Sequence, residues 1–363
     1  MKPIKINIVL FGIGNVGSTL IQQVIESQKF FLEKKNIELR FPIITNSTLA
    51  FFENESELNS WEVNFSEFAI PYKIDDIINY TKRKGFENLI AVDASASSKL
   101  VKSYSTLIEN NFHLVSANKI ANTLSFDFYK KIREKLIQYD KKYLYETNVG
   151  GGLPIINTVH DLHFSGDQIT KIKGVFSGSL SYIFNRFASE DVLFSAVLKD
   201  AEKLGYTEPD SREDLSGNDV ARKLLVLARE IGLEVEFSEI NITSLLLPNL
   251  NEKLSKSEYS ISKNLFDEPY RIAKITQQDG HVLRYIGELD VKKNKLEVKL
   301  VSVPGNSTLG QLKGADSLIE IYTHSYGENP IVIQGAGAGK EVTARGVLTD
   351  ILRLSEKNTI QLV

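Results

Sequence analysis

The segment Ile6-Asn-Ile-Val-Leu-Phe-Gly12-Ile-Gly-Asn-Val-Gly17 lies close to the start of this chain of 363 residues. Its apolar first half predicts a buried strand, and Val16–Glu26 behind it predicts a helix. Between these elements, Gly12 would permit a tight turn, Gly14 would let the backbone approach a pyrophosphate, and Gly17 would let the helix pack closely on the strand. The segment therefore predicts a dinucleotide site formed by Gly12, Ile13, Gly14, Asn15, Val16 and Gly17. An ordinary tight turn is the alternative.

Strand-like and helix-like runs continue to alternate through the first 150 residues. Further strands are predicted at Leu39–Ile44, Leu89–Val92, His113–Val115 and Tyr143–Tyr145. Helices are predicted at Asp75–Lys84, Val101–Asn110 and Phe126–Tyr139. Because short apolar strands separated by helices indicate βαβ units, we expect an α/β, Rossmann-type fold with a doubly wound parallel sheet.

The glycine-rich segment Asn148-Val-Gly-Gly-Gly-Leu-Pro154 breaks this alternation and predicts a domain boundary. We expect a first domain over residues 1–147, and a second, α+β domain with a mixed sheet over residues 148–335. Residues 336–363 are expected to complete the first domain, with a helix at Glu341–Leu354. One apolar stripe of that helix is formed by Val347, Leu348, Ile351 and Leu354. In the second domain, helices are predicted at Ile155–Asp161, Leu180–Phe187, Val192–Lys203 and Asp219–Ile231, and strands at Leu283–Leu289 and Leu296–Val303.

Composition and charge exclude several classes of function. The net charge of −3 argues against a dedicated nucleic-acid binder, which usually has a basic surplus. The chain has no cysteine, so it has no disulfide framework, thiolate nucleophile or cysteine zinc site. The apolar run Ile4–Ile13 is too short to span a membrane, and no later segment is long enough. We expect a cytoplasmic protein that binds neither membrane nor nucleic acid.

The residues after the second predicted strand bear on the choice of dinucleotide. Thr45-Asn46-Ser47 contains no carboxylate to bind the ribose 2′-hydroxyl of NAD. Nothing there repels the 2′-phosphate of NADP, although Arg40 lies too early in the strand to clamp that phosphate. Both NADP and NAD stay open as cofactors, with NADP slightly favoured.

Four later segments carry a family resemblance. They are Ser116-Ala-Asn-Lys119, Glu146-Thr-Asn-Val-Gly-Gly-Gly-Leu-Pro154, Gly174-Val-Phe-Ser-Gly-Ser-Leu-Ser-Tyr-Ile183 and Gly205-Tyr-Thr-Glu-Pro-Asp-Ser-Arg-Glu-Asp-Leu-Ser-Gly-Asn-Asp-Val-Ala-Arg-Lys223. Together they resemble homoserine dehydrogenase, which interconverts L-aspartate 4-semialdehyde and L-homoserine in threonine and methionine biosynthesis. The resemblance covers nearly the whole chain, and its last segment is the most specific. The length fits a short monofunctional form, without an aspartate kinase or an ACT domain.

The resemblance implies roles for individual residues. Lys119 and Lys223 would transfer a proton at the substrate carbonyl, and Asp219 would organise the site. Glu208, Asp214, Lys223 and Gly178 would bind the substrate. Backbone carbonyls of Glu146, Val149, Gly151 and Leu153 would hold a structural, sodium-like cation, and the second domain would form a homodimer. The dinucleotide would also contact residues that are chosen by their positions in the chain: Ala94, Ser95, Lys119, Gly337 and Gly339.

The same residues make chemical sense without the family. Lys119 follows a predicted strand, where open α/β sheets bind ligands, so it can donate a proton to a substrate oxygen; a solvated loop lysine is the alternative. Asp219 and Lys223 are spaced i,i+4 beside the apolar face of their helix, so they can line a pocket; a surface ion pair is the alternative. The acidic run Glu208–Asp214 suits a substrate ammonium, although such a run is more often a solvated loop.

Some features depart from the family pattern. Ser179 replaces a more usual Thr, the common His-Pro-Leu element is missing from Val303–Gly310, and Asp316-Ser317 stands where an Asn is frequent. Contacts from this late region therefore stay open.

His160 and His163 share a helical spacing but have no third ligand, so we expect no transition-metal site. Two other functions remain as alternatives: a related amino-acid-pathway NAD(P) reductase, and a catalytically silent nucleotide sensor.

Overall fold

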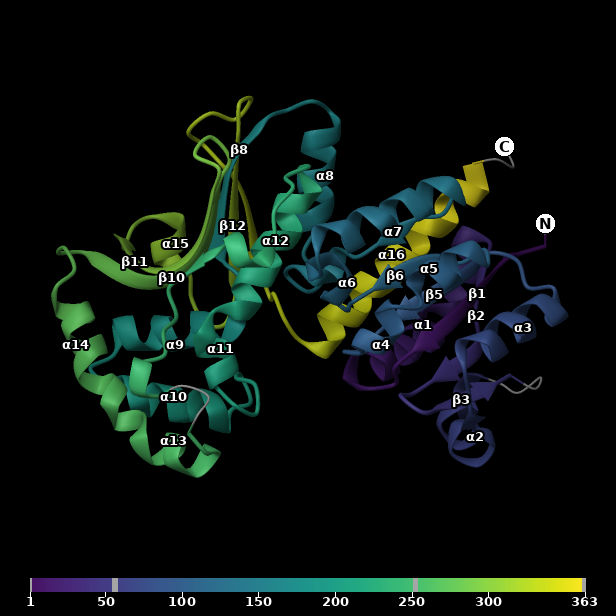
Figure 1. Ribbon diagram of the computed structural model, residues 1–363, viewed down its shortest axis with the longest axis horizontal. Helices are drawn as coiled ribbons and strands as arrows, with labels where there is room; N and C mark the ends of the chain where they lie inside the picture. The colour runs from purple at the N-terminus through teal and green to yellow at the C-terminus, as the bar shows by residue number, and fades with distance from the viewer. Residues whose placement is uncertain (1, 54–57, 251–253, 361–363) are drawn as a thin grey trace. The chain divides into compact units, whose positions relative to one another are not determined.

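The computed structural model describes residues 2–53, 58–250 and 254–360 (Figure 1). By its internal contacts the chain divides into two compact units. The first unit comprises residues 1–152 and 339–363, and the second comprises residues 153–338. Both divisions fall in glycine-containing segments, a few residues after the domain boundaries that we predicted at 147/148 and 335/336.

The first unit is built on a seven-stranded sheet. Its strands are β1 (Ile4–Phe11), β2 (Ile37–Thr45), β3 (Leu49–Phe52), β4 (Ile70–Pro71), β5 (Leu89–Asp93), β6 (His113–Ser116) and β7 (Tyr143–Leu144). They lie in the order β4-β3-β2-β1-β5-β6-β7; the five strands from β2 to β7 are parallel, while β3 and β4 pair antiparallel at one edge. The strand order reverses between β1 and β5, and such sheets bind ligands at the carboxyl ends of the strands beside this reversal. The predicted doubly wound, largely parallel sheet is confirmed.

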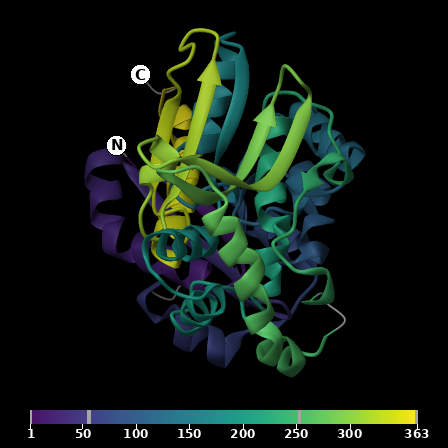
Figure 2. The ribbon, with the colours of Figure 1, turned by 90° about the vertical axis from the view of Figure 1, so that its left-hand side faces the viewer.

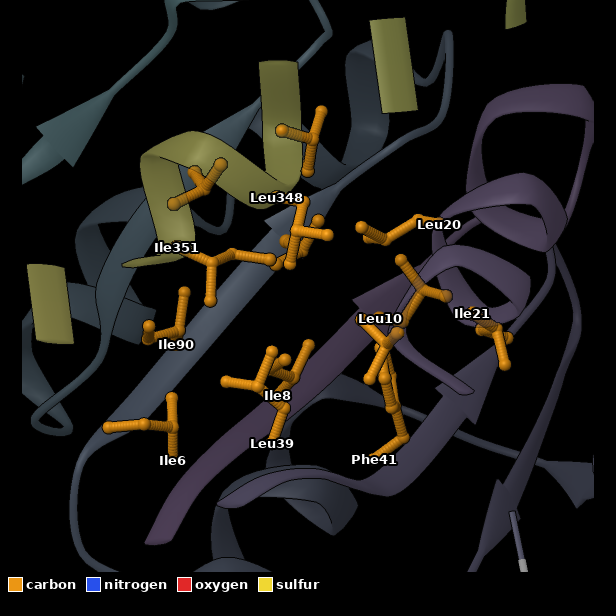
Figure 3. Packing of buried hydrophobic residues seen from close by; sticks show 14 of the residues in the cluster. Ile6, Ile8, Leu10, Leu20, Ile21, Leu39, Phe41, Ile90, Leu348 and Ile351 are labelled. Carbon is orange, nitrogen blue, oxygen red and sulfur yellow. The ribbon is translucent and has the colours of Figure 1, made fainter. Parts of the chain in front are cut away.

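Helices cover both faces of this sheet and bury its central strands. On one face, α1 (Asn15–Lys35) and α16 (Lys340–Ile360) pack on β1 through residues such as Leu20 and Leu348, opposite Ile8 (Figure 3). The other face meets α3 (Ile74–Lys84), α5 (Tyr104–Glu109) and α7 (Phe126–Gln138). Because both faces are buried, β1 reads as a nearly continuous apolar run rather than an alternating one. Among the described residues, no helix combines the length and the apolar character needed to cross a membrane.

Shorter helices complete the first unit. They are η1 (Leu58–Ser60), α2 (Trp61–Phe68), α4 (Ser98–Val101), α6 (Ile120–Thr123) and η2 (Glu146–Asn148). The predicted helix Val101–Asn110 is therefore divided between α4 and α5. The predicted helix Val16–Glu26 continues as α1 to Lys35 and ends at Asn36, whose left-handed backbone (φ 55°) closes it.

The second unit carries a six-stranded mixed sheet (Figure 2). Its strands are β8 (Ile169–Val175), β9 (Asn241–Ile242), β10 (His281–Asp290), β11 (Lys295–Pro304), β12 (Ser317–Thr323) and β13 (Ile331–Gly335). They lie in the order β13-β12-β8-β10-β11-β9, with antiparallel pairs except for β9 and β11. The mixed sheet that we predicted is confirmed.

Helices of the second unit cover part of this sheet and extend beyond it. They are α8 (Ile155–Phe164), α9 (Gly178–Ser189), α10 (Phe194–Lys203), α11 (Arg212–Ser216), α12 (Asn218–Glu230), η3 (Phe237–Glu239), η4 (Pro248–Leu250), α13 (Lys256–Ser262), η5 (Lys263–Phe266), α14 (Asp267–Ile275) and α15 (Thr308–Gln311). Helices α9 and α12 pack against β10. Both helices belong to the same unit as the acidic residues of the predicted substrate site.

Candidate active site

The glycine turn between β1 and α1 has the backbone geometry of a dinucleotide site. Gly12 adopts φ 100° and donates from its N–H to the Thr45 carbonyl at 2.9 Å. A methyl group on Gly17 would overlap with the Gly12 carbonyl oxygen, so Gly17 permits close packing of the turn itself as well as of the helix. At Gly14 a methyl group would meet no protein atom within 4 Å, which leaves space on the ligand side. Helix α1 begins at Asn15 with no acidic residue in its first turn, so its N–H groups and dipole favour an anion.

The loop after β5 lies beside this turn. Ala94 donates from its N–H to the Phe11 carbonyl at 2.9 Å, and a methyl group on Gly12 would meet Ala94 and Ser95 at 3.0–3.1 Å. Thus the predicted dinucleotide residues of β1 and β5 come together at the point where the strand order reverses. Gly339, with φ 122°, precedes α16 in the first unit, whereas Gly337 belongs to the second.

The end of β2 carries no carboxylate. Strand β2 ends at Thr45, and the Asn46 Oδ1 accepts hydrogen bonds from the N–H groups of Thr48 and Leu49 at 2.9 and 2.7 Å. This turn leads into β3, which we did not predict. Tyr72 donates from its hydroxyl to the Asn46 carbonyl at 3.2 Å and closes the turn from the other side.

Lys119 lies three residues beyond the end of β6, as the N-cap residue of α6. Its carbonyl accepts the Asn122 N–H at 3.0 Å. The preceding residue, Asn118, is buried and donates from its side chain to the Asp93 carboxylate at 3.0 Å. Burial raises the pKa of Asp93, while hydrogen bonds from Ser95, Tyr104 and Asn118 oppose that shift. We had assigned no role to either Asp93 or Asn118.

The segment that we predicted to bind a cation follows β7. Gly150 and Gly151 have φ 75° and 60°, so glycine is required for this backbone path. The Glu146 carbonyl accepts the Val149 N–H at 3.3 Å, and the Leu153 carbonyl accepts the Ile155 N–H at 2.9 Å. Glu146, Val149 and Gly151 belong to the first unit, and Leu153 belongs to the second. Oxygen donors on such a backbone suit a hard cation; no set of three His, Asp or Glu side chains in the described residues could hold a metal.

Helix α16 contacts this segment through charged side chains. The Asp350 carboxylate accepts the Glu146 N–H at 3.0 Å, and Arg353 lies 3.5 Å from both Asp350 and Glu146. Burial raises the pKa of Asp350 to about 6. Asn148 donates to the Ser116 carbonyl at 2.9 Å and accepts from Asn122 at 2.9 Å, so the segment is also tied to the loop that carries Lys119.

An acidic cavity of about 600 Å³ lies on the second unit. It is lined by Ser177, Glu208, Asp210, Arg212, Glu213, Asp214, Ser216, Asn218, Asp219, Val220 and Arg222. Five carboxylates against two guanidinium groups favour a positively charged ligand group. The structure thus gathers Glu208, Asp214 and Asp219, which we had predicted as site residues, around one cavity.

Lys223 is held at its ammonium by two acceptors. Its Nζ lies 2.8 Å from the Asp219 carboxylate and donates to the Phe176 carbonyl at 2.8 Å. Only 11% of the Lys223 side chain is exposed, against 45% for Asp219. The predicted i,i+4 pair is therefore formed, but Asp219 lines the cavity and Lys223 is not among its lining residues. A mostly buried lysine next to a carboxylate is better oriented than an exposed surface pair.

Asp214 organises the wall of this cavity. Its two oxygens accept from the Ser179 hydroxyl at 2.6 Å and from the Glu208 N–H at 2.9 Å, and burial raises its pKa. Ser179 thus uses its hydroxyl, which it shares with the threonine that is more usual at this position. Gly178 is the first residue of α9, where a methyl group would lie 3.0 Å from the Ala315 carbonyl. The Ser177 hydroxyl caps the same helix by accepting the Leu180 N–H at 3.3 Å.

The fold and these two regions define the class of the protein: a two-unit, dinucleotide-binding oxidoreductase with a Rossmann-type first unit. A sequence model described as homoserine dehydrogenase matches residues 154–352. Another, described as homoserine dehydrogenase, NAD binding domain, matches residues 12–146. The chain belongs to the homoserine dehydrogenase family.

Two relatives carry the name of this family, and one solved structure of unknown function has the same fold. Homoserine dehydrogenase of Emericella nidulans is 33% identical over 98% of this chain and 99% of its own length. Bifunctional aspartokinase/homoserine dehydrogenase of Buchnera aphidicola is 41% identical over 96% of this chain, which spans 42% of that protein. A solved structure from Candida auris, of a protein of unknown function, matches with a TM-score of 0.89 and 32% identity over 97% of this chain and 98% of its own.

Proposed function

We propose that the chain interconverts L-aspartate 4-semialdehyde and L-homoserine with NADP or NAD. The observation that carries the proposal is the placement of the Lys223 ammonium between the Asp219 carboxylate and the Phe176 carbonyl. Lys223 and Asp219 lie on α12, and Asp219 lines the acidic cavity. A protein that only sensed a dinucleotide would need the glycine turn but not this lysine. A related reductase would need the turn and a proton donor, but not this set of carboxylates.

The carboxylates select the substrate's amino end. Homoserine and its aldehyde carry an ammonium group, and a buried or half-buried ammonium requires acceptors. Glu208 is exposed and supplies a carboxylate at the cavity, while Asp214 is fixed by Ser179 and the Glu208 N–H. Gly178 lets the start of α9 approach the Ala315 carbonyl closely, because a methyl group there would lie 3.0 Å from that oxygen. These residues act mainly in binding.

The lysines act on the substrate oxygen. When bound, the nicotinamide supplies or accepts the hydride. Lys223 donates a hydrogen bond or proton to the oxygen on which negative charge develops, and Asp219 orients its ammonium. Lys119 is the second donor and also contacts the dinucleotide.

The two parts of the chain divide this work. Residues 1–147 and 336–363 bind the dinucleotide, and residues 148–335 bind the substrate and form a homodimer. The dinucleotide contacts are Gly12, Ile13, Gly14, Asn15, Val16, Gly17, Ala94, Ser95, Gly337 and Gly339. The absence of a carboxylate from Thr45-Asn46-Ser47-Thr48 supports NADP as a cofactor at least as good as NAD.

Three further features belong to the proposal. The left-handed backbone at Gly150 and Gly151 supports a structural monovalent cation on the carbonyls of Glu146, Val149, Gly151 and Leu153. Light scattering tests the homodimer, and a comparison of thermal stability in sodium and in a bulky organic cation tests the ion. We also place the chain in the cytoplasm, a location that cell fractionation tests.

A turnover assay decides between the proposal and its alternatives. Homoserine and other amino-acid-derived alcohols are each offered with NADP and with NAD, and the product is identified by mass spectrometry. We expect turnover with homoserine above all others, with NADP at least as effective as NAD. Turnover of a different alcohol alone would favour the related reductase, and dinucleotide binding without any turnover would favour the sensor.

A further inference from the structure

We propose that Asp93 and Asn118 are positioning residues: the buried Asp93 carboxylate sets the place of Lys119 through Asn118, and that of the dinucleotide loop through Ser95. The inference rests on the proposed function of Lys119. It concerns a cluster of buried polar side chains that the proposed chemistry does not itself use.

Asp93 ends β5 at the edge of the sheet where the glycine turn lies, and it is 2% exposed. Its Oδ1 accepts the Ser95 N–H at 2.9 Å and the Ser95 hydroxyl at 2.6 Å. Its Oδ2 accepts the Tyr104 hydroxyl at 2.7 Å and the Asn118 side-chain amide at 3.0 Å. Four donors occupy the two oxygens, which is close to the full acceptor capacity of an ionised carboxylate.

Asn118 connects the Asp93 carboxylate to the backbone beside Lys119. Its amide donates to Asp93 and to the Ser97 carbonyl at 3.2 Å, while its Oδ1 accepts the Ile120 N–H at 3.1 Å. Its own N–H donates to the Ser116 hydroxyl at 3.0 Å. The residues on both sides of Lys119 are thereby bonded through one buried side chain, so the Lys119 backbone cannot move without breaking these bonds.

The carboxylate connects two parts of the proposed site. Ser95 belongs to the loop that we propose to contact the dinucleotide, and Asn118 precedes the lysine that we propose to act on the substrate. One anion therefore accepts from both loops and fixes the distance between them. A loose supporting arrangement is costly, because displacing a reacting group by about 1 Å lowers the rate by about 10²-fold.

The test is a double-mutant cycle on the full chain. Asn118→Asp, Lys119→Ala and the combined variant are compared by kcat with homoserine, and by the dissociation constant for reduced dinucleotide measured by its fluorescence. If Asn118 acts through Lys119, Asn118→Asp lowers kcat by roughly 10–100-fold in the wild-type background and has no further effect once Lys119 is alanine. Asn110→Asp is the matched control: the Asn110 side-chain amide donates to the Thr106 carbonyl at 2.8 Å and, among the described residues, to no other group, so the variant leaves kcat unchanged.

Exchanging the carboxylate and the amide between positions 93 and 118 gives a second test, in which a recovery of kcat would not be expected from a purely structural role. Asp93→Asn alone lowers kcat and weakens dinucleotide binding, and the pair Asp93→Asn with Asn118→Asp recovers part of kcat, since an amide and a carboxylate again face each other. Equal losses from Asn118→Asp with and without Lys119 would overturn the inference while leaving the proposed function intact. Wild-type turnover in Lys119→Ala would remove the role of Lys119 and this inference with it. If Asn118→Asp does not fold, Asn118→Ser serves instead, because a serine hydroxyl can still cap Ile120 but is too short to reach Asp93.

Discussion

The glycine turn of the first unit and the acidic cavity of the second, which we propose to bind the dinucleotide and the substrate, depend on opposite properties of their residues. In the turn, the residues matter for the side chains that they lack: Gly12 has a positive φ, and Gly17 has no room for a methyl group. In the cavity, the residues matter for their charges, as with Asp219 and Lys223. A substitution should therefore act through shape in the first region and through charge in the second.

The largest effect is expected from removing a charge in the proposed chemistry. Lys223→Ala and Lys119→Ala should each lower turnover by roughly 10²–10⁴-fold, the usual range for a positioned acid–base group. Dinucleotide affinity of Lys223→Ala should stay at the wild-type value, because the glycine turn is untouched. Lys292→Ala, which alters an exposed lysine in the β10–β11 turn, is the control. Steady-state kinetics that show near-normal turnover in both site variants would refute the charge mechanism.

The next effect tests shape in the glycine turn. Gly17→Ala should destabilise the first unit and abolish detectable dinucleotide binding, because its methyl group overlaps with the Gly12 carbonyl. Gly14→Ala should keep the melting temperature and weaken dinucleotide binding by about tenfold, a loss of about 1.4 kcal/mol, because only the ligand would meet the methyl group. Thermal unfolding and fluorescence titration measure both. Unaltered binding in Gly14→Ala would mean that the dinucleotide does not approach there.

A milder change in the cavity separates binding from chemistry. Glu208→Gln removes one exposed carboxylate without changing its size, so KM for homoserine should rise by about tenfold while kcat changes little. The ammonium is held equally in the ground and transition states, which is why the rate constant is spared. A fall in kcat with an unchanged KM would place Glu208 in the chemistry instead.

The same contrast explains what could be predicted from the sequence. The turn has a local signature, and the pair Asp219 and Lys223 follows from helical spacing, so the turn's place between β1 and α1 and the formation of the pair agree with the sequence, while their roles in binding and catalysis stay predictions. Strands β8 and β12 were missed, because Lys173 and Glu320 interrupt their apolar pattern and pair with each other across the sheet at 3.1 Å. Asp93 was missed for a different reason. Its partners Ser95, Tyr104 and Asn118 come from three separate segments, and no local pattern brings them together.

The smallest effect concerns a titrating group outside both regions. The pKa of His113 is lowered to about 4, mainly by burial and then by Lys141, and its Nδ1 accepts the Lys142 N–H at 3.0 Å. Because this pKa lies below the ordinary value of about 6.5, the neutral form is favoured in the folded state, and stability is lost as the pH falls from 6.5 towards 4. His113→Asn keeps an acceptor for Lys142 and cannot be protonated. Its melting temperature should fall less than that of the wild type over this range; an equal fall would assign the dependence to other groups.

We propose that hydride passes between the nicotinamide of the dinucleotide and the aldehyde carbon of L-aspartate 4-semialdehyde. The most direct test of this claim uses NADPH carrying deuterium at the transferred position of nicotinamide C4, with L-aspartate 4-semialdehyde as the acceptor. Mass spectrometry of the product should show homoserine that contains one deuterium, on the carbon that bore the aldehyde. Unlabelled homoserine, or no homoserine at all, would contradict the claim.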